Sequence, residues 1–346
     1  MRDTALLVHA VTLASIAWAV AIAVGWLLCF LARFKERRTR QEVGRPPSTH
    51  HFFYRFGGLV LAAGFFGALF FDNRLVSDTR LQILIVGSLL ALAIGMYDDW
   101  RPLHWSYQLL GQLLLGGMLL SSGMKIAHLD LGAGMVVYFD AVIPFLSGII
   151  TLWWVVLVMN ATNWVDGADG LVGGVIGVAL LVLAWLSWQP PVYQPTLTLL
   201  TLMLGGALLG FLCFNWYPAR LIAGSGGVNF LGFLLAAFSV YAGAKVATAL
   251  LVLTIPVLDL FSVILARLRK GRSPFLPDQG HLHHILLSRG FSPRGITGIY
   301  ILFTGVMGML SLVTKSMGKF YVFLLAGIVF FSVLGWMHWG VAKKEN

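Results

Sequence analysis

Long apolar runs recur about every thirty residues along this chain, and their spacing constrains the fold more than any other feature. A transmembrane helix needs ~20 apolar residues, and eleven runs reach or approach that length. The runs cover residues 5–32, 56–71, 81–96, 107–121, 142–159, 171–188, 196–214, 228–243, 246–265, 296–313 and 320–339. No interval leaves room for a water-soluble domain. We therefore predict an all-α polytopic integral membrane protein of about eleven transmembrane helices, forming one domain over residues 1–346.

The composition also indicates a membrane protein. Only 11% of the 346 residues are charged and 58% are hydrophobic, whereas a soluble globular domain has roughly 25% charged residues. The first run is too long for a signal-peptide core and its basic residues follow it, so we interpret it as a retained span. Cys29 and Cys213 lie inside apolar runs without pairing or metal-ligand spacing.

The distribution of lysine and arginine predicts the orientation. Residues 33–55, Arg101, Arg220, 267–294 and 343–344 together hold 17 of the 24 basic residues, so this side is predicted to be cytoplasmic. The chain would then cross the plasma (inner) membrane with its N-terminus outside and its C-terminus inside. The net charge of +10 follows from this topology and from anionic lipid headgroups. DNA-binding signatures are absent from the sequence, and we expect no nucleic-acid partner.

Residues 124–139, between the fourth and fifth runs, alternate apolar and polar side chains around a Gly-Ala-Gly turn. This alternation predicts a small outward-facing β-hairpin. It is the one β element that we expect in an otherwise helical chain.

Polar side chains follow the apolar run 149–159 at intervals of three residues. They are Asn160, Asn163, Asp166 and Asp169. In a regular α-helix this spacing carries the side chains half-way round the axis, whereas a 3₁₀ segment or a break near the glycines at 167 and 170 keeps them on one side. We predict a break. A helix cap and a polar turn would explain one Asp and one Asn, but not four such groups.

Two adjacent carboxylates, Asp98 and Asp99, close the third run in "GMYDDW". A carboxylate at the centre of a bilayer costs roughly 2.5 to 3.5 kcal/mol, so we expect these groups at the membrane rim. Neighbouring residues on a helix point about 100° apart, and both can face one ligand only where the helix frays or ends. A solvated helix end is the alternative interpretation of this pair.

A third polar group occurs in "PDQGHLHH", within a basic loop. Its side chains are Asp278, His281, His283 and His284, and the basic neighbours are Arg267, Arg269, Lys270, Arg272, Arg289 and Arg294. Three histidines and an aspartate could bind zinc, but no cysteine supports that interpretation. The arginines favour an anionic phosphate, with histidine as a donor or proton-transfer group. An ordinary positive-inside loop would explain the arginines and leave the histidines unexplained.

The three polar groups share one chemical requirement. Crowded carboxylates repel each other unless a cation lies among them, and oxygen ligands beside phosphates suit Mg²⁺ or Mn²⁺ better than zinc. A cytoplasmic cleft with such an ion, basic side chains and amides can bind a nucleotide diphosphate. Its position at the bilayer rim would let a lipid partner enter from the side.

Five motifs in order carry a resemblance to a known family. They are "GMYDDW", "NATNWVDGADGL", "FNWYPARLIAG", "PVLDLFSVILARLRKGRSPF" and "PDQGHLHH". The chain resembles the polyprenyl-phosphate N-acetylhexosamine-1-phosphate transferases over at least residues 56–294. The resemblance implies transfer of a sugar 1-phosphate from a UDP-sugar donor to a polyprenyl phosphate acceptor, with release of UMP, Mg²⁺ as cofactor and a cytoplasmic active site. Such a reaction would initiate a cell-surface glycan.

The resemblance also implies roles for individual residues. Asp98 and Asp99 would lie at the metal and the lipid phosphate, with Asp98 activating the attacking phosphate. Asp166 would bind the metal as well, and His281 would join these three aspartates in catalysis. The nucleotide and diphosphate pocket is assigned to Asn160, Asn163, Asp166 and Asp169, and the pyrophosphate to Arg272, His281, His283 and His284.

The chain departs from the family pattern at several positions. Ser225 stands where a metal-binding aspartate is usual, Ile222 where an aromatic often stacks on uracil, and Gln108 where a lysine is common. A serine oxygen or a bridging water could still complete the metal's ligands.

The N-terminal basic motif is also remodelled, with His50, His51 and Arg55 as substitutes. These changes keep a second hypothesis open, a family member that binds lipid phosphate or nucleotide without turnover. A third is a membrane transporter, since Pro256 and Asp259 within the ninth run could break a helix at mid-membrane. Apolar faces embedded in the membrane also make a homodimer possible.

Overall fold

The computed structural model describes residues 2–43, 54–75, 78–132, 134–190, 192–241, 246–273 and 280–342. Every predicted apolar run coincides with a helix or a helix pair in these residues. The helices are α1 (Arg2–Val43), α3 (Gly57–Phe71), α4 (Thr79–Trp100), α5 (Trp105–Ser121), α6 (Phe139–Val142), α7 (Leu146–Val165), α8 (Leu171–Trp188), α9 (Pro195–Asn215), α10 (Gly224–Tyr241), α11 (Val246–Val252), α12 (Thr254–Arg269), α13 (Leu282–Ser288), α14 (Pro293–Val313) and α15 (Ser316–Ala342).

The prediction of a polytopic helical membrane protein is confirmed, whereas the count of about eleven spans remains a prediction. Within the described residues, eight helices are long and apolar enough to cross a membrane, or nine if the bent pair α11 and α12 forms one span. Two of the eleven predicted runs fold as shorter helices, because α3 has 15 residues and α5 has 17. Both fall short of the ~20 residues of a full crossing.

The buried helix α10 lies at the centre of the bundle. Nearly all of its residues are buried, and it packs against α3, α4 and α7. Glycine permits these close approaches: a Cβ at Gly95 of α4 would strike the backbone of Ser225 and Gly226, and a Cβ at Gly58 of α3 would strike that of Gly227. The first turn of α10 therefore touches two neighbouring helices through backbone atoms.

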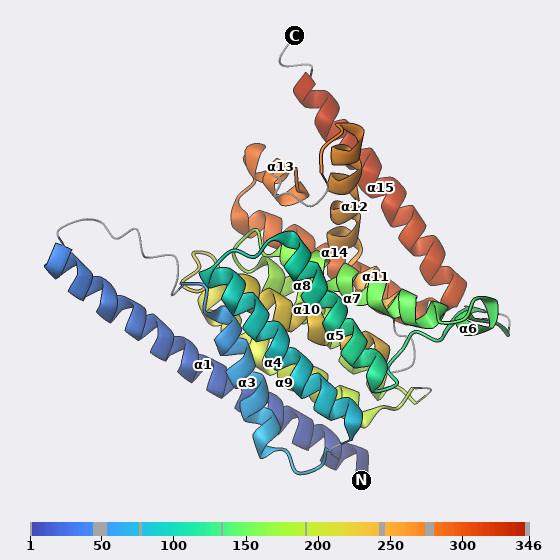
Figure 1. Ribbon diagram of the computed structural model, residues 1–346, viewed down its shortest axis with the longest axis horizontal. Coiled ribbons are helices and arrows are strands. Elements are labelled where there is room, and N and C mark those ends of the chain that lie inside the picture. The colour runs from blue at the N-terminus through green and yellow to red at the C-terminus, as the bar shows by residue number, and fades with distance from the viewer. Residues whose placement is uncertain are drawn as a thin grey trace.

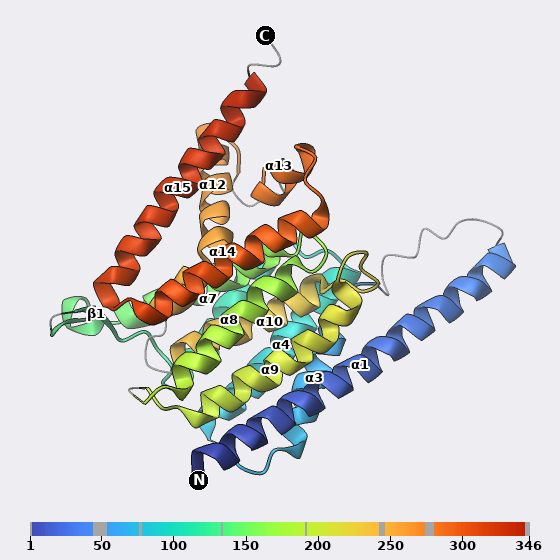
Figure 2. The same cartoon turned by 180° about the vertical axis from the view of Figure 1, so that it is seen from behind.

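The outer helices lie on two sides of this centre. Figure 1 shows α1 running diagonally along one side, where it packs against α9 and α3. On the opposite side, α12 and α15 rise away from the bundle, and Figure 2 shows α14 passing across α8. The site described below lies at the end of the bundle where α4 and α7 finish and α10 begins.

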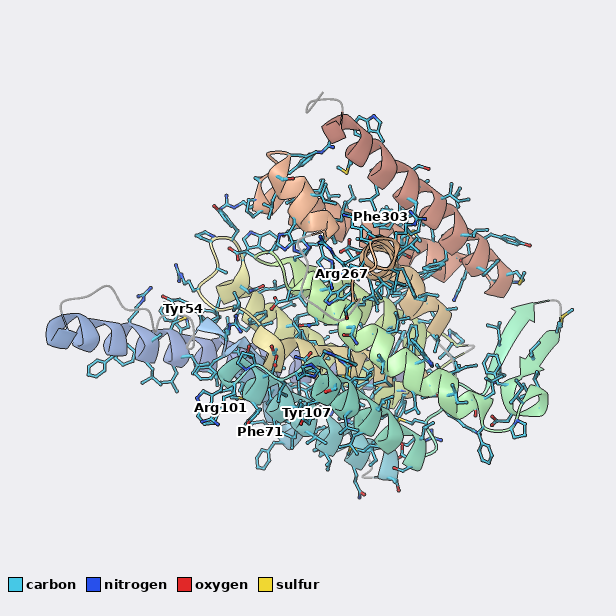
Figure 3. The ribbon with its side chains drawn as sticks, turned by 45° about the horizontal axis from the view of Figure 1, so that its top comes forward. Tyr54, Phe71, Arg101, Tyr107, Arg267 and Phe303 are labelled. Carbon is cyan, nitrogen blue, oxygen red and sulfur yellow. The ribbon has the colours of Figure 1, made fainter. Side chains whose placement is uncertain are left out.

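A sharp bend separates α11 from α12. Their axes differ by 75°. Thr254, the first residue of α12, donates its hydroxyl to the carbonyls of Leu250 (3.4 Å) and Leu251 (2.5 Å) at the end of α11. Figure 3 views α12 nearly along its axis, with Arg267 and Phe303 labelled beside it. The sequence hypothesis of a broken helix in the ninth run is therefore correct as regards the backbone.

The predicted hairpin is confirmed. Strands β1 (His128–Gly132) and β2 (Met135–Tyr138) pair antiparallel, with His128 opposite Tyr138. Gly132 and Gly134 both have φ of +81°, a conformation that favours glycine. Lys125 pairs with Asp140 beyond the strands at 2.8 Å. That the hairpin faces outward remains a prediction.

Candidate active site

Asp99 joins three segments of the chain. It lies in the last turn of α4, and its side chain is 5% exposed. Its Oδ1 accepts hydrogen bonds from Arg55 Nη1 and from the backbone N–H of Ser225, each at 3.1 Å, and its Oδ2 accepts one from Gly226 N–H at 3.1 Å. The first turn of a helix carries unpaired N–H groups and positive potential, so α10 is a suitable partner for this carboxylate.

Asp166 meets the same turn from the other side. It follows the last residue of α7 and accepts a hydrogen bond from the backbone N–H of Gly224. Burial raises the pKa of Asp166 to about 8, and the negative charges of Asp99 and Asp169 add to this effect, against the Gly224 hydrogen bond and Arg55. Two carboxylates 67 residues apart in sequence thus converge on the start of α10.

Asp98 points elsewhere. Its Oδ1 accepts hydrogen bonds from the backbone N–H of Leu103 at 2.7 Å and from Gln108 Nε2 at 3.1 Å. The adjacent aspartates diverge because both still lie within the helix, where neighbouring side chains point about 100° apart. The structure therefore brings Asp99 and Asp166 together but places Asp98 with α5, where Gln108 donates to it.

The polar stripe after residue 159 divides between a helix and a turn. Helix α7 continues regularly to Val165, so Asn160 faces α5 and donates to Gln112 Oε1 at 2.9 Å, whereas Asn163 is exposed. The chain breaks at residues 166–170, before α8 begins. The predicted break is confirmed, and it sends the two asparagines and the two aspartates into different surroundings.

Asp169 binds neighbouring loops. Its Oδ2 accepts a hydrogen bond from Ala219 N–H at 2.9 Å, and its backbone carbonyl accepts one from the hydroxyl of Thr297 at 2.9 Å. Gly170 has φ of +74° and donates its N–H to Asn215 Oδ1 at 3.0 Å. The turn that carries Asp166 is therefore fixed to α14 and to the loop before α10.

The histidines of the "HLHH" segment pack against this turn. His281 lies edge-on to Trp164 of α7, with ring centroids 4.6 Å apart, and stacks on His283 at 5.8 Å. His283 is buried against Gly167, where an added Cβ would strike the His283 ring. Burial lowers the pKa of His283 to about 4, aided by His284, so His283 is neutral near pH 7.

The other predicted residues of this loop are less enclosed. His284 is partly buried, with its ring centroid 4.1 Å from that of His283, and Arg272 is exposed. Asp278, and the substitutes His50 and His51, lie outside the described residues.

The sequence did not predict the side-chain partners of two residues at the site, Arg55 and Asp259. Arg55 pairs with Asp99, and Asp259 pairs with His281 through Oδ2 and Nδ1 at 3.0 Å. The transporter hypothesis had placed Asp259 at an open mid-membrane site, but this carboxylate is 5% exposed and is bound by the histidine segment. A lone aspartate in an apolar run is the signal that marked it, since such a group needs a partner.

The carboxylates suit a divalent cation only together with a substrate. No three His, Cys, Asp or Glu side chains lie together as a metal site in the part of the chain that the structure describes. Asp99 and Asp166 bring two carboxylates to one turn, and Ser225 lies in the same turn, so these side chains could supply oxygen ligands. Mg²⁺ commonly takes one or two carboxylates and completes its shell with water and substrate phosphates. The donor set fits that pattern.

Comparison with known proteins identifies the family. The model of glycosyl transferase family 4 matches residues 81–243. The decaprenyl-phosphate N-acetylglucosaminephosphotransferase of Mycobacterium tuberculosis is 31% identical over 286 residues, which cover 73% of this chain and 70% of that protein. The probable undecaprenyl-phosphate N-acetylglucosaminyl 1-phosphate transferase of Bacillus subtilis is 27% identical over 301 residues, covering 81% and 79%. The undecaprenyl-phosphate alpha-N-acetylglucosaminyl 1-phosphate transferase of Yersinia pestis is 26% identical over 272 residues, covering 75% and 73%. The family match and these relatives show that this multi-pass membrane protein belongs to glycosyl transferase family 4.

Proposed function

We propose that this protein transfers an N-acetylhexosamine 1-phosphate from a UDP-sugar to a polyprenyl phosphate and releases UMP. The relatives named above act on decaprenyl or undecaprenyl phosphate with an N-acetylglucosamine phosphate. The observation that carries the proposal is the convergence of Asp99 and Asp166 on the first turn of α10, next to a histidine-rich segment. Carboxylates that can hold a divalent cation, beside imidazole and guanidinium donors, form a site for a diphosphate.

The transfer itself needs little covalent help from the protein. An oxygen of the lipid phosphate attacks the β-phosphorus of the donor, the bond from that phosphorus to the bridging oxygen breaks, and UMP leaves with the electron pair. The lipid phosphate is anionic near pH 7, so orientation and charge stabilisation dominate. His281, His284 and Arg272 would contact the diphosphate, and the exposed Asn163 would contact the nucleotide.

A divalent cation, Mg²⁺ or Mn²⁺, would be held by Asp99 and Asp166, with Ser225 in the position of a third ligand. When bound, it would neutralise charge on the diphosphate. Arg55 supports this arrangement by compensating the negative charge of Asp99. Asp98 accepts a hydrogen bond from Gln108, and it would lie near the polyprenyl phosphate acceptor instead of binding the cation.

We further propose that this site faces the cytoplasm. Arg55, Arg101, Arg272 and Arg294 accompany the site in sequence segments that lie on the positively charged side of the predicted topology. The acceptor would then reach the site from the inner leaflet of the plasma membrane, and the product would initiate a surface glycan.

A homodimer remains a proposal that cross-linking in native membranes would test.

The test is a reconstitution. Purified protein is incubated in nanodiscs with polyprenyl phosphate, Mg²⁺ and a panel of UDP-sugars, and UMP is followed. We expect UMP release that depends on both the lipid and the metal with at least one UDP-N-acetylhexosamine. Absence of UMP with every donor, combined with measurable binding of polyprenyl phosphate, would favour the hypothesis of a family member that binds without turnover.

A further inference from the structure

Asp259 is a buried carboxylate whose two oxygens are both bound by the histidine segment. It lies in the second turn of α12, beyond the 75° bend, and its side chain is 5% exposed. Its Oδ2 contacts His281 Nδ1 at 3.0 Å, and its Oδ1 accepts the backbone N–H of Leu282 at 2.8 Å. A carboxylate in apolar surroundings is retained at such a position only with donors of this kind.

The contact determines which nitrogen of His281 remains for a ligand. A carboxylate offers only acceptors, so Nδ1 must carry the proton in the Asp259 hydrogen bond. The ring plane is fixed as well, because Trp164 lies edge-on at 4.6 Å and His283 stacks at 5.8 Å with an interplanar angle of 9°. Nε2 lies at the far edge of the ring from α12, and no described residue bonds to it.

We propose that Asp259 is a positioning residue for the transfer reaction: its carboxylate accepts from Nδ1–H of His281, so that Nε2 faces the diphosphate of the sugar donor and, on taking up a proton, donates to it from an imidazolium cation. The identity of that ligand rests on the proposed function. The orientation of the ring rests only on the contacts of Asp259, Trp164 and His283.

The informative substitution is Asp259→Asn. An asparagine has one acceptor oxygen and one donor NH₂ group, so it cannot accept from both Leu282 N–H and His281 Nδ1–H. With the oxygen on Leu282, the NH₂ group faces Nδ1, so His281 stays neutral with its single proton on Nε2 and cannot present a positive charge to the diphosphate. We expect turnover to fall on the order of 10²-fold, the loss typical of removing one charge-stabilising contact of a catalytic site.

A double-mutant cycle separates positioning from a general structural role. If Asp259 acts through His281, Asp259→Asn should lower turnover in the wild type but have no further effect in a His281→Ala background. Asp259→Glu keeps the carboxylate, so its turnover should be about tenfold higher than that of Asp259→Asn. This would recover a part of the 10²-fold loss. Independent, multiplicative losses of the two single variants would overturn the proposal.

A second readout needs no turnover. Full-length protein labelled with [¹⁵N]histidine contains nine histidines, and long-range ¹H–¹⁵N correlation of the imidazoles distinguishes their tautomers. His281→Ala identifies the signal, which should show the Nδ1–H form in the wild type and the Nε2–H form in Asp259→Asn. An Nε2–H form in the wild type would overturn the proposal even if Asp259→Asn fails to fold.

The chain provides a matched control. Asp72 is also a buried carboxylate, with Oδ1 on His9 Nε2 at 2.7 Å and Oδ2 on the backbone N–H groups of Arg74 and Leu75. It follows the far end of α3 from the site. Asp72→Asn should alter only the His9 signal and leave turnover unchanged. If the wild type releases no UMP, the proposed function fails, and the tautomer measurement still decides the role of Asp259.

Discussion

Replacing Gly95 by alanine tests whether the contact between α4 and α10 sets the position of Asp99. A Cβ at Gly95 would lie 2.6 Å from the Cα of Gly226, whereas ordinary contacts begin at 3.4 Å. The two helices must therefore separate by roughly 1 Å, which lies within the range of overpacking that costs about 1–3 kcal/mol of stability. Asp99 is one turn beyond Gly95, on the same face of α4.

The same separation acts on the hydrogen bonds of the site. Asp99 accepts from Ser225 N–H and Gly226 N–H at 3.1 Å, and an extra ~1 Å puts both beyond hydrogen-bond range. Misplacement of a catalytic group by about 1 Å can lower a rate on the order of 10²-fold. We therefore expect Gly95→Ala to fold with a lowered thermal midpoint and to release UMP on the order of 10²-fold more slowly.

The matched control is Gly117→Ala. Gly117 is exposed in the interior of α5, and nothing lies within 4 Å of an added Cβ. Alanine is favoured over glycine in a helix by up to about 1 kcal/mol, so this variant should be as stable as the wild type or more so, with unchanged turnover. Wild-type UMP release by a folded Gly95→Ala protein would refute the argument that backbone contact with α10 fixes Asp99.

Four further predictions follow from the site. Asp99→Asn or Asp166→Asn should abolish UMP release while circular dichroism and the thermal midpoint show an intact fold; unchanged turnover in both would place the site elsewhere. Ser225→Asp adds a negative oxygen ligand and should lower the Mg²⁺ concentration for half-maximal activity, and an unaltered metal titration would put Ser225 outside the ligand shell. The pKa of Asp166 is raised to about 8 from its ordinary 3.8, so the metal-free folded protein holds a proton that the unfolded chain releases above pH 4. The thermal midpoint of the metal-free protein should therefore decrease as the pH rises from about 4 through 8. Asp166→Asn should remove that dependence. Gly167→Ala should displace the His283 ring and lower turnover, whereas equal activity would show that this ring can move without consequence.

Residue chemistry made much of the fold and site predictable. Unbroken apolar runs are recognisable without tertiary context, so the helices and the hairpin turn at Gly132 to Gly134 could be predicted. The break at residues 166–170 followed from its glycines and polar groups. The number of spans remains a prediction, because apolar content alone does not show how the shorter helices α3 and α5 lie relative to a membrane.

The pairing of side chains was harder to predict. Asp98 and Asp99 are adjacent, yet one binds α5 and the other α10, and only the helical twist at the end of α4 decides which. The Asp259–His281 pair depends on the bend before α12, which turns a carboxylate in an apolar run towards a loop 22 residues later. No spacing rule connects those two positions, since the contact is created by tertiary structure.

The bend itself shows how a membrane helix tolerates an interruption inside the bundle. Where a helix changes direction, carbonyl oxygens lose their amide partners, and hydrocarbon offers no water to replace them. Here one buried hydroxyl, that of Thr254, reaches both orphaned oxygens of Leu250 and Leu251. A single small polar side chain thus satisfies the carbonyl groups at the corner, so that α12 can leave the direction of α11.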